Sequence, residues 1–197
     1  MDGQTFERGE MAGPVAVELP PALRPSRLAR LLHLDELLLL GMRRFHGPWR
    51  TLLARAFTRA GDASSWTLLG LSLLATLQAP CVHLAARLGV GAGIATLLAQ
   101  VLKRRLLRPR PSRAIEGFLP LADNPDAFSF PSGHTAAAFA VAAAVAGEPF
   151  GAGPIALALA CGIGASRVYL GAHYPLDVAV GSALGTLAGL LARLAVP

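Results

Sequence analysis

Long apolar stretches restrict the fold of this chain more than any other feature of its sequence. Five of them follow one another, at about residues 63–80, 83–102, 132–147, 152–169 and 174–193. Each is near the ~20 residues that a helix needs to cross a bilayer. Because backbone polar groups inside lipid must be satisfied within the protein, such stretches form helices. The sequence therefore predicts an all-α fold, a polytopic membrane helix bundle with about five transmembrane helices.

The composition supports close packing of these helices. The chain is 53% hydrophobic and only 15% charged, and its apolar residues are mainly Ala, Leu, Val and Gly. Small residues let helices approach one another in lipid. Glycines recur at helix-packing spacing in the second and fifth stretches, at Gly89, Gly91, Gly93, Gly181, Gly185 and Gly189. We expect them to pack between helices.

Three regions are expected along the chain. Residues 1–25 are polar and punctuated by Pro and Gly, and are predicted to be disordered. Residues 26–62 hold two amphipathic segments, at 27–45 and about 49–60, predicted to be interfacial helices on the membrane surface. A helix pair that is solvated or packed on a partner is the alternative. Residues 63–197 form the predicted transmembrane domain, which holds all the motifs described below.

The charge of the chain indicates its partners. The formal net charge is +6, from 18 basic and 12 acidic residues. A mean hydropathy of +0.50 and the lack of aromatic residues interleaved with Arg argue against nucleic acid. Membrane lipids with anionic headgroups, or phosphates, are the expected partners. The connection at 103–131 contains five prolines, so it is expected to be irregular and outside the hydrocarbon.

Polar residues concentrate at four ends of the predicted spans. If the spans alternate in direction, these ends emerge on the same face of the membrane. The residues concerned are Lys103 and Arg110, then Ser132, Gly133 and His134, then Arg167, His173 and Asp177. The sequence thus predicts one shallow site that combines three cations, two histidines, one carboxylate and a Ser-Gly turn.

This combination of side chains suits a phosphate ligand. Lys103, Arg110 and Arg167 supply positive charge and directed donors, which match phosphate oxygens. Ser132 and Gly133 precede a predicted helix, whose N-terminal N–H groups favour an anion. Two histidines can divide nucleophilic attack and proton donation.

His173 and Asp177 are expected to lie within about one helical turn of each other. If both are helical, they share a face. Pro175 disfavours helical backbone at Tyr174, so the alternative places His173 just before the helix, with Asp177 in its first turn. A carboxylate beside one imidazole nitrogen fixes the tautomer and leaves the other nitrogen free to attack.

Three motifs together resemble the signature of the type 2 phosphatidic acid phosphatase (PAP2) superfamily of lipid phosphatases. They are Lys103-x6-Arg110-Pro111, Pro131-Ser132-Gly133-His134 and Ser166-Arg167-x5-His173-x3-Asp177. The resemblance implies a metal-independent phosphatase without a cofactor. By this likeness His173 is the nucleophile, Asp177 orients it and His134 protonates the leaving group. Lys103, Arg110, Ser132, Gly133 and Arg167 would bind the phosphoryl oxygens.

Other charged and aromatic residues received simpler interpretations. Arg104, Arg105, Arg108 and Arg113 match no motif position and are predicted to be membrane-surface charges. Arg87 is expected to snorkel from near the start of the second span. Tyr169 and Tyr174 could either reach a substrate or belong to an interfacial aromatic belt.

The distribution of arginine predicts an orientation. Basic residues are more numerous on the face that carries the motifs, so the positive-inside rule places the site on the cytoplasmic face, in a bacterial inner membrane. Isoprenyl or polyprenyl phosphates and diphosphates, phosphatidate and phosphatidylglycerophosphate all suit the site as substrates. A phosphotransferase that uses the same phosphohistidine and a non-catalytic lipid-binding protein are the alternative functions.

Overall fold

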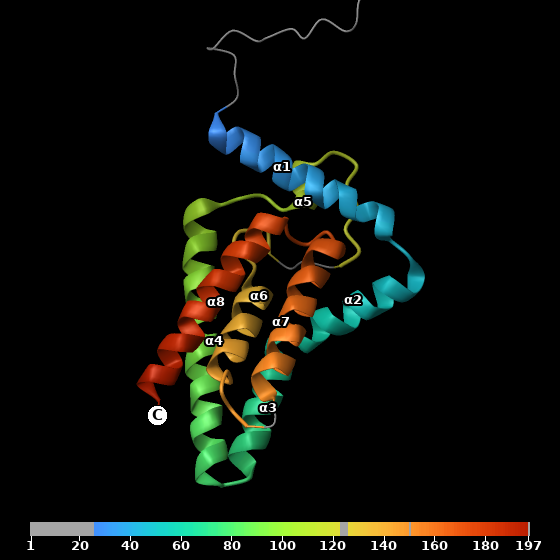
Figure 1. Cartoon of the computed structure of the whole chain (residues 1–197). Helices are drawn as coiled ribbons and strands as arrows, with labels where there is room; N and C mark the ends of the chain where they lie inside the picture. Colours follow the sequence, from blue (N-terminus) through green and yellow to red (C-terminus); the bar gives the residue numbers. More distant parts are fainter. Residues whose placement is uncertain (1–25, 123–125, 150, 197) are drawn as a thin grey trace, which may run out of the picture.

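A computed structural model of the chain describes residues 26–122, 126–149 and 151–196. Figure 1 shows a helix bundle crossed at one end by the N-terminal helix. The elements are α1 (Arg27–Met42), the 3₁₀ turn η2 (Arg43–Phe45), α2 (Pro48–Ala60), α3 (Ala63–Ala75), α4 (Ala79–Leu106), α5 (Pro111–Ala114), α6 (Gly133–Ala144), α7 (Ala152–Tyr169) and α8 (Pro175–Ala195). The described residues form no β-strand, which confirms the all-α prediction. Residues 1–25, predicted to be disordered, lie outside the described part of the chain.

Helix α6 lies at the centre of the bundle, among α4, α7 and α8. Of its 12 residues, 9 are buried. Neighbours on three sides explain its alanine-rich sequence, because small side chains let all of them approach. The closest approach is that of α8, where a Cβ added to Gly185 or Gly189 would overlap the carbonyl oxygens of Ala136 or Ala140. The prediction that the glycines of the fifth stretch pack between helices is confirmed.

Within the described residues, three helices are long and apolar enough to cross a membrane, namely α4, α7 and α8. At about 1.5 Å per residue, α3 and α6 reach about 20 Å, which is less than the ~30 Å hydrocarbon core. The predicted C-terminal boundary of the first span, at residue 80, is wrong. Helix α3 stops at Ala75, the chain reverses at Leu77 with a φ of 53°, and α4 begins at Ala79. The last residues of the predicted first span thus belong to the turn and to α4.

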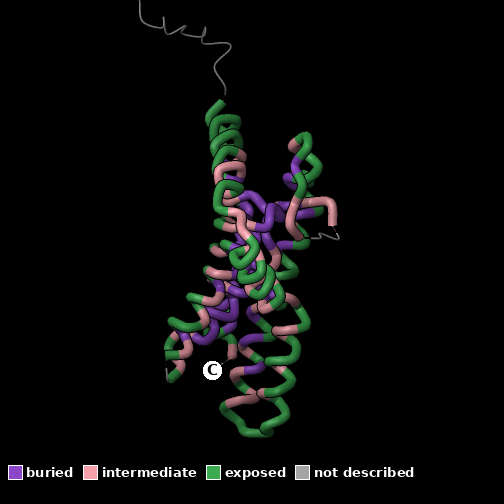
Figure 2. The backbone as a smooth tube through the Cα atoms, turned by 90° about the vertical axis from the view of Figure 1, so that its right-hand side faces the viewer, coloured by how far each residue is buried: buried purple, intermediate pink, exposed green. Residues whose placement is uncertain are grey.

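The outer surface of the bundle is apolar. Figure 2 shows buried backbone in the middle of the molecule and exposed backbone along the outer helices. Large apolar side chains such as Leu97, Leu187 and Leu191 are exposed on α4 and α8. In water such a surface would be unfavourable, whereas in a bilayer it contacts lipid.

At the end of the bundle away from α1, Arg87 forms an ion pair and a hydrogen bond within the protein. Arg87 of α4 pairs with Glu148 at 2.7 Å and donates from Nε to the carbonyl oxygen of Val196 at 2.8 Å. It therefore joins α4 to the α6–α7 loop and to the end of α8. An acidic partner and a helix-end carbonyl thus lie within the reach of Arg87, and its snorkelling toward the membrane surface stays a prediction.

Helices α1 and α2 make different contacts with the bundle. Helix α2 packs along α7, where the hydroxyl of Tyr169 accepts the N–H of Gly47 at 3.1 Å and lies 3.1 Å from the hydroxyl of Thr51. Helix α1 crosses the end of the bundle and buries only Asp35 and Leu39. Six of its leucines stay exposed: Leu28, Leu31, Leu32, Leu34, Leu37 and Leu38. The interfacial placement of α1 stays a prediction that these side chains favour.

Candidate active site

The three motifs meet at the end of the bundle that α1 crosses. A cavity of about 1450 Å³ opens there, and from the motifs it is lined by Lys103, Arg110, Gly133, His134, Arg167 and His173. The motif segments are joined directly, since the N–H of Ser132 donates to the carbonyl oxygen of Asp177 at 3.0 Å. Four helix ends therefore build a single site, as the alternating direction of the spans predicts.

His173 lies just before α8, with Asp177 in the first turn of this helix. Tyr174 is the N-cap residue and Pro175 begins the helix, as the sequence predicts. Oδ2 of Asp177 accepts the N–H of Tyr174 at 2.9 Å and lies 3.5 Å from Nδ1 of His173. Both side chains are fully buried. The carboxylate thus faces one nitrogen of the imidazole and leaves the other toward the cavity.

The surroundings of His173 determine its charge and tautomer. Burial lowers the pKa of His173 to about 4 against the opposing influence of Asp177, and the charges of Arg167 and Arg110 act in the same direction as burial. The ring is therefore neutral at pH 7. Its Nε2 lies 3.4 Å from Nη1 of Arg110, which can only donate, so Nε2 presents its lone pair and Nδ1 carries the proton toward Asp177.

Two of the predicted phosphate-binding cations share an acidic partner that the sequence analysis missed. Lys103 donates to Oδ2 of Asp126 at 2.7 Å, and Arg110 forms an ion pair with Oδ1 of the same carboxylate. Nη1 of Arg110 also donates to the carbonyl oxygen of Ala172 at 2.7 Å. Partial burial works in the opposite direction, but hydrogen bonds and charges of Lys103 and Arg110 hold the pKa of Asp126 below its usual range. The carboxylate of Asp126 therefore already binds two of the cations that are predicted to bind phosphate.

Arg167 brings a third positive charge into the same cavity. Its guanidinium is buried and lies 3.3 Å from the hydroxyl of Thr58 on α2. Thr58 in turn lies 2.9 Å from the hydroxyl of Ser166. Helix α2 thus contributes to the placement of the arginine. Three buried cations in one cavity are stable only with compensating anionic or polar groups, so the site is suited to an anion.

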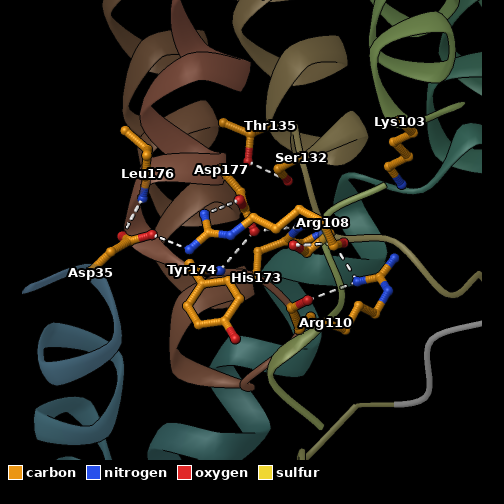
Figure 3. Close-up of polar contacts among 12 residues, drawn as sticks. Asp35, Lys103, Arg108, Arg110, Ser132, Thr135, His173, Tyr174, Leu176 and Asp177 are labelled. Atoms are coloured by element: carbon orange, nitrogen blue, oxygen red, sulfur yellow. Dashed lines mark hydrogen bonds and ion pairs between the residues drawn. The ribbon is translucent and has the colours of Figure 1, made fainter. Parts of the chain in front are cut away.

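At the N-terminus of α6, Ser132 and Gly133 have different positions relative to the cavity. Gly133 lines the cavity, where free N–H groups of the first helical turn favour negative charge. Ser132 is fully buried, and its hydroxyl accepts from Thr135 at 2.9 Å (Figure 3). Ser132 is the N-cap residue of α6 by position, but its hydroxyl makes no capping hydrogen bond and its side chain is not among those that line the cavity.

His134 belongs to a second histidine–carboxylate pair. Its Nε2 lies 2.8 Å from Oδ1 of Asp62, the residue before α3. Both side chains are partly exposed, at 31% and 43%, whereas His173 and Asp177 are enclosed. The site therefore holds one imidazole shielded from water and another at the water boundary.

One residue contradicts its interpretation from the sequence. Arg108 was predicted to be a membrane-surface charge, but it bridges the carboxylates of Asp35 and Asp177 at 2.7 Å each. Its guanidinium lies 3.9 Å from the centre of the Tyr174 ring. The ring of Tyr174 is thus part of this cluster, and the hydroxyl of Tyr169 contacts the start of α2. Contact of either ring with a substrate or with a membrane interface stays a prediction. Arg104, Arg105 and Arg113 are exposed, as predicted.

Comparison with known proteins identifies the family. The model of the PAP2 superfamily matches residues 84–197, which include all three motifs. The chain belongs to the PAP2 superfamily. The PAP2 match covers α4 through α8 except the first turn of α4, and it leaves out α1, α2 and α3. The partners Asp35 and Asp62 consequently come from outside the matched region.

One curated relative of the chain is named as a phosphatase. The chain is similar to the decaprenylphosphoryl-5-phosphoribose phosphatase of Mycobacterium tuberculosis, with 39% identity over 103 residues, 52% of this chain and 56% of that protein. The chain therefore spans about half the length of this curated relative.

Two solved structures extend the likeness over most of the chain. One is the transmembrane PAP2-type phosphatidylglycerolphosphate phosphatase of Bacillus subtilis, with 28% identity and a TM-score of 0.68 over 83% of this chain and 85% of that one. The other is Aquifex aeolicus LpxE, with 29% identity and a TM-score of 0.69 over 82% of this chain and 93% of that one. The predicted membrane helix bundle is confirmed, and the chain is an integral membrane protein.

Proposed function

We propose that this protein is a membrane lipid phosphate phosphatase that works through a phosphohistidine intermediate. The observation that carries the proposal is the position of His173, whose Nε2 faces a cavity lined by Lys103, Arg110 and Arg167. A phosphoryl group bound to these cations would lie next to a nucleophilic lone pair. Preorganised donors of this kind stabilise the charge that develops in a transition state.

The proposed reaction has two balanced steps. Nε2 of His173 attacks phosphorus and the bond to the lipid oxygen breaks, while His134 gives this oxygen a proton. Water then attacks the phosphohistidine, gives its proton back to His134 and releases inorganic phosphate. Asp177 stabilises the imidazolium that forms in the first step through its position beside Nδ1. The position of His134 at the water boundary suits both of its proton transfers.

Asp126 is proposed to compete with the substrate for Lys103 and Arg110. Asp126→Asn is expected to lower KM, by about 10-fold if the carboxylate occupies the cations nine-tenths of the time. The measurement is KM for a lipid phosphate in detergent. Glu116→Gln, an exposed change in the same segment, is the matched control. An unchanged or higher KM in Asp126→Asn would show that the carboxylate assists binding.

The shape of the cavity supports a substrate with a long apolar tail. From the cationic end the cavity continues along α3 and α4, where Trp66, Leu74, Leu88 and Leu97 line it. Gly89 and Gly93 of α4 also line it, and a Cβ added at either would meet nothing within 4 Å. The prediction that these two glycines pack between helices is therefore wrong, since they leave space beside the cavity. We propose isoprenyl, polyprenyl or diacylglycerol phosphates as substrates.

Phosphate release from a panel of such lipids tests the proposed function. The purified full chain in detergent, with EDTA present, is expected to release phosphate from at least one of them. Transfer of the phosphoryl group to an added alcohol in place of water would identify a phosphotransferase. Binding of the lipids without release would identify a non-catalytic protein, and loss of activity in EDTA would overturn the metal-independent reaction.

The site is proposed to face the cytoplasm, on the basis of the positive-inside rule. Exposed arginines lie on α2, in the turn before it, near the end of α4 and on α5: Arg43, Arg44, Arg50, Arg55, Arg59, Arg104, Arg105 and Arg113. In a background without Cys81 and Cys161, a cysteine replacing the exposed Ser112 is expected to resist an impermeant reagent in intact cells and to react after lysis. Labelling in intact cells would place the site on the outer face.

A further inference from the structure

The cluster around Arg108 lies next to the proposed nucleophile but outside the cavity. Nη1 of Arg108 donates to Oδ1 of Asp177 and Nη2 to Oδ2 of Asp35, both at 2.7 Å (Figure 3). Both carboxylates are buried. Neither Arg108 nor Asp35 is among the residues that line the cavity. The two residues are therefore not placed to touch a phosphoryl group.

Asp35 makes a second contact that reaches the start of α8. Its Oδ1 accepts the backbone N–H of Leu176 at 2.7 Å, across 141 positions of the chain. Leu176 lies in the first turn of α8, where N–H groups have no partner within the helix. One carboxylate from α1 thus satisfies this helix end and binds the guanidinium that holds Asp177.

The contacts of Asp177 explain what this arrangement achieves. Arg108 binds Oδ1, which leaves Oδ2 to face the N–H of Tyr174 and Nδ1 of His173. Without the guanidinium, the carboxylate could rotate about its side-chain bonds, and Oδ2 would lose its fixed direction. The ring of Tyr174, stacked on Arg108, limits the movement of the guanidinium as well.

We propose that Arg108 and Asp35 are positioning residues for His173 and that α1 is consequently part of the active site. They act through Asp177, which they hold in the orientation that fixes the tautomer of the nucleophile. This inference rests on the proposed phosphatase function. It also gives α1 a role that its amphipathic sequence alone does not indicate.

The test compares kcat with KM for Arg108→Gln in the full chain, in detergent, with a lipid phosphate that the wild type hydrolyses. We expect kcat to fall by about 10- to 100-fold, the range measured when partners that orient a functional histidine are removed, while KM changes less than about threefold. Arg105→Gln, an exposed neighbour, is the matched control and is expected to retain wild-type values.

Asp35→Asn examines the same pathway from α1. The amide oxygen can still accept the N–H of Leu176, but the negative charge that pairs with Arg108 is lost, so kcat is expected to fall with little change in KM. The double variant Arg108→Gln/Asp35→Asn is expected to be no slower than Arg108→Gln, because both changes remove one effect. Glu36→Gln is the control on the same helix.

If Arg108→Gln does not give a monodisperse protein, Arg108→Lys replaces it. Lysine retains the positive charge but cannot donate to two carboxylates as the guanidinium does, so an intermediate kcat is expected.

An unchanged kcat in Arg108→Gln would overturn the inference. If KM rises at the same time, Arg108 is a substrate-binding cation. Losses in kcat that multiply in the double variant would also overturn the inference, because the two residues would then act independently. A wild-type protein that releases no phosphate from any lipid would overturn the proposed function itself. The wild type therefore tests the function, and the variants test the positioning role of Arg108 and Asp35.

Discussion

Replacing His173 with alanine is expected to reduce the rate of phosphate release by about 10⁴- to 10⁶-fold, as the removal of a nucleophile does elsewhere. The reason is that Nε2 of His173 is the atom proposed to attack phosphorus, and water would have to replace it within the same cavity. The measurement is phosphate release from a lipid phosphate in detergent. His33→Ala, an exposed histidine change on α1, is the matched control and is expected to be as active as the wild type.

The same variant distinguishes catalysis from substrate binding. The cations Lys103, Arg110 and Arg167 stay in place when His173 is shortened, so the variant is expected to retain affinity for the lipid phosphate. Equilibrium binding of a radiolabelled lipid phosphate measures this affinity. A His173→Ala protein that releases phosphate at more than a hundredth of the wild-type rate would contradict the assignment of the nucleophile.

Asp177→Asn is expected to reduce kcat by about 10⁴-fold, the loss that follows when the orienting carboxylate of a serine protease triad becomes an amide. An amide can turn its NH₂ group toward Nδ1, which favours the wrong tautomer of His173. The change also removes one of the two anionic partners of Arg108, which keeps its ion pair with Asp35, so some loss of stability is expected. Thermal unfolding of the variant therefore accompanies the kinetic measurement.

Ser182→Ala is the control for Asp177→Asn, since its hydroxyl donates only to the carbonyl oxygen of Val178 in the same helix. It is expected to leave kcat and the unfolding temperature near their wild-type values. If Asp177→Asn unfolds as the wild type does and retains kcat within tenfold, the carboxylate does not orient the nucleophile.

The motif residues could be placed from the sequence because their positions are set by local rules. Each motif lies at a helix end, and spans that alternate in direction bring these ends to one face. Pro175 similarly indicates the start of α8, and the observed relation of His173 and Asp177 is one of the two arrangements that the sequence allows. Such signals need only a few neighbouring residues and the geometry of a membrane helix.

The acidic partners could not be placed in this way. Asp35, Asp62 and Asp126 come from α1, from the turn before α3 and from the irregular connection, and no local pattern indicates that they reach the site. Arg108 was misinterpreted for the same reason, since its two carboxylates lie 69 and 73 positions away. Charges at a span end are usually exposed, and only the tertiary arrangement shows which of them are buried.

The sequence likewise indicates where the helices lie but not where they end. Apolar composition located all five helices of the bundle, but it could not show that the chain reverses at Leu77 or that α6 has 12 residues. These boundaries depend on packing: α6 is enclosed by its neighbours, and its ends are set by the site on one side and by a loop on the other. Glycine spacing likewise did not distinguish Gly91, which packs against Gly189, from Gly89 and Gly93 beside the cavity.

Chemical trapping tests the central claim most directly. A lipid phosphate labelled with ³²P is mixed with the protein, the reaction is quenched in alkali within a single turnover, and the labelled peptide is sequenced. A phosphohistidine intermediate predicts an alkali-stable, acid-labile label on His173 that is absent from His173→Ala. A label on any other residue, or a turnover that passes no label through the protein, would contradict it.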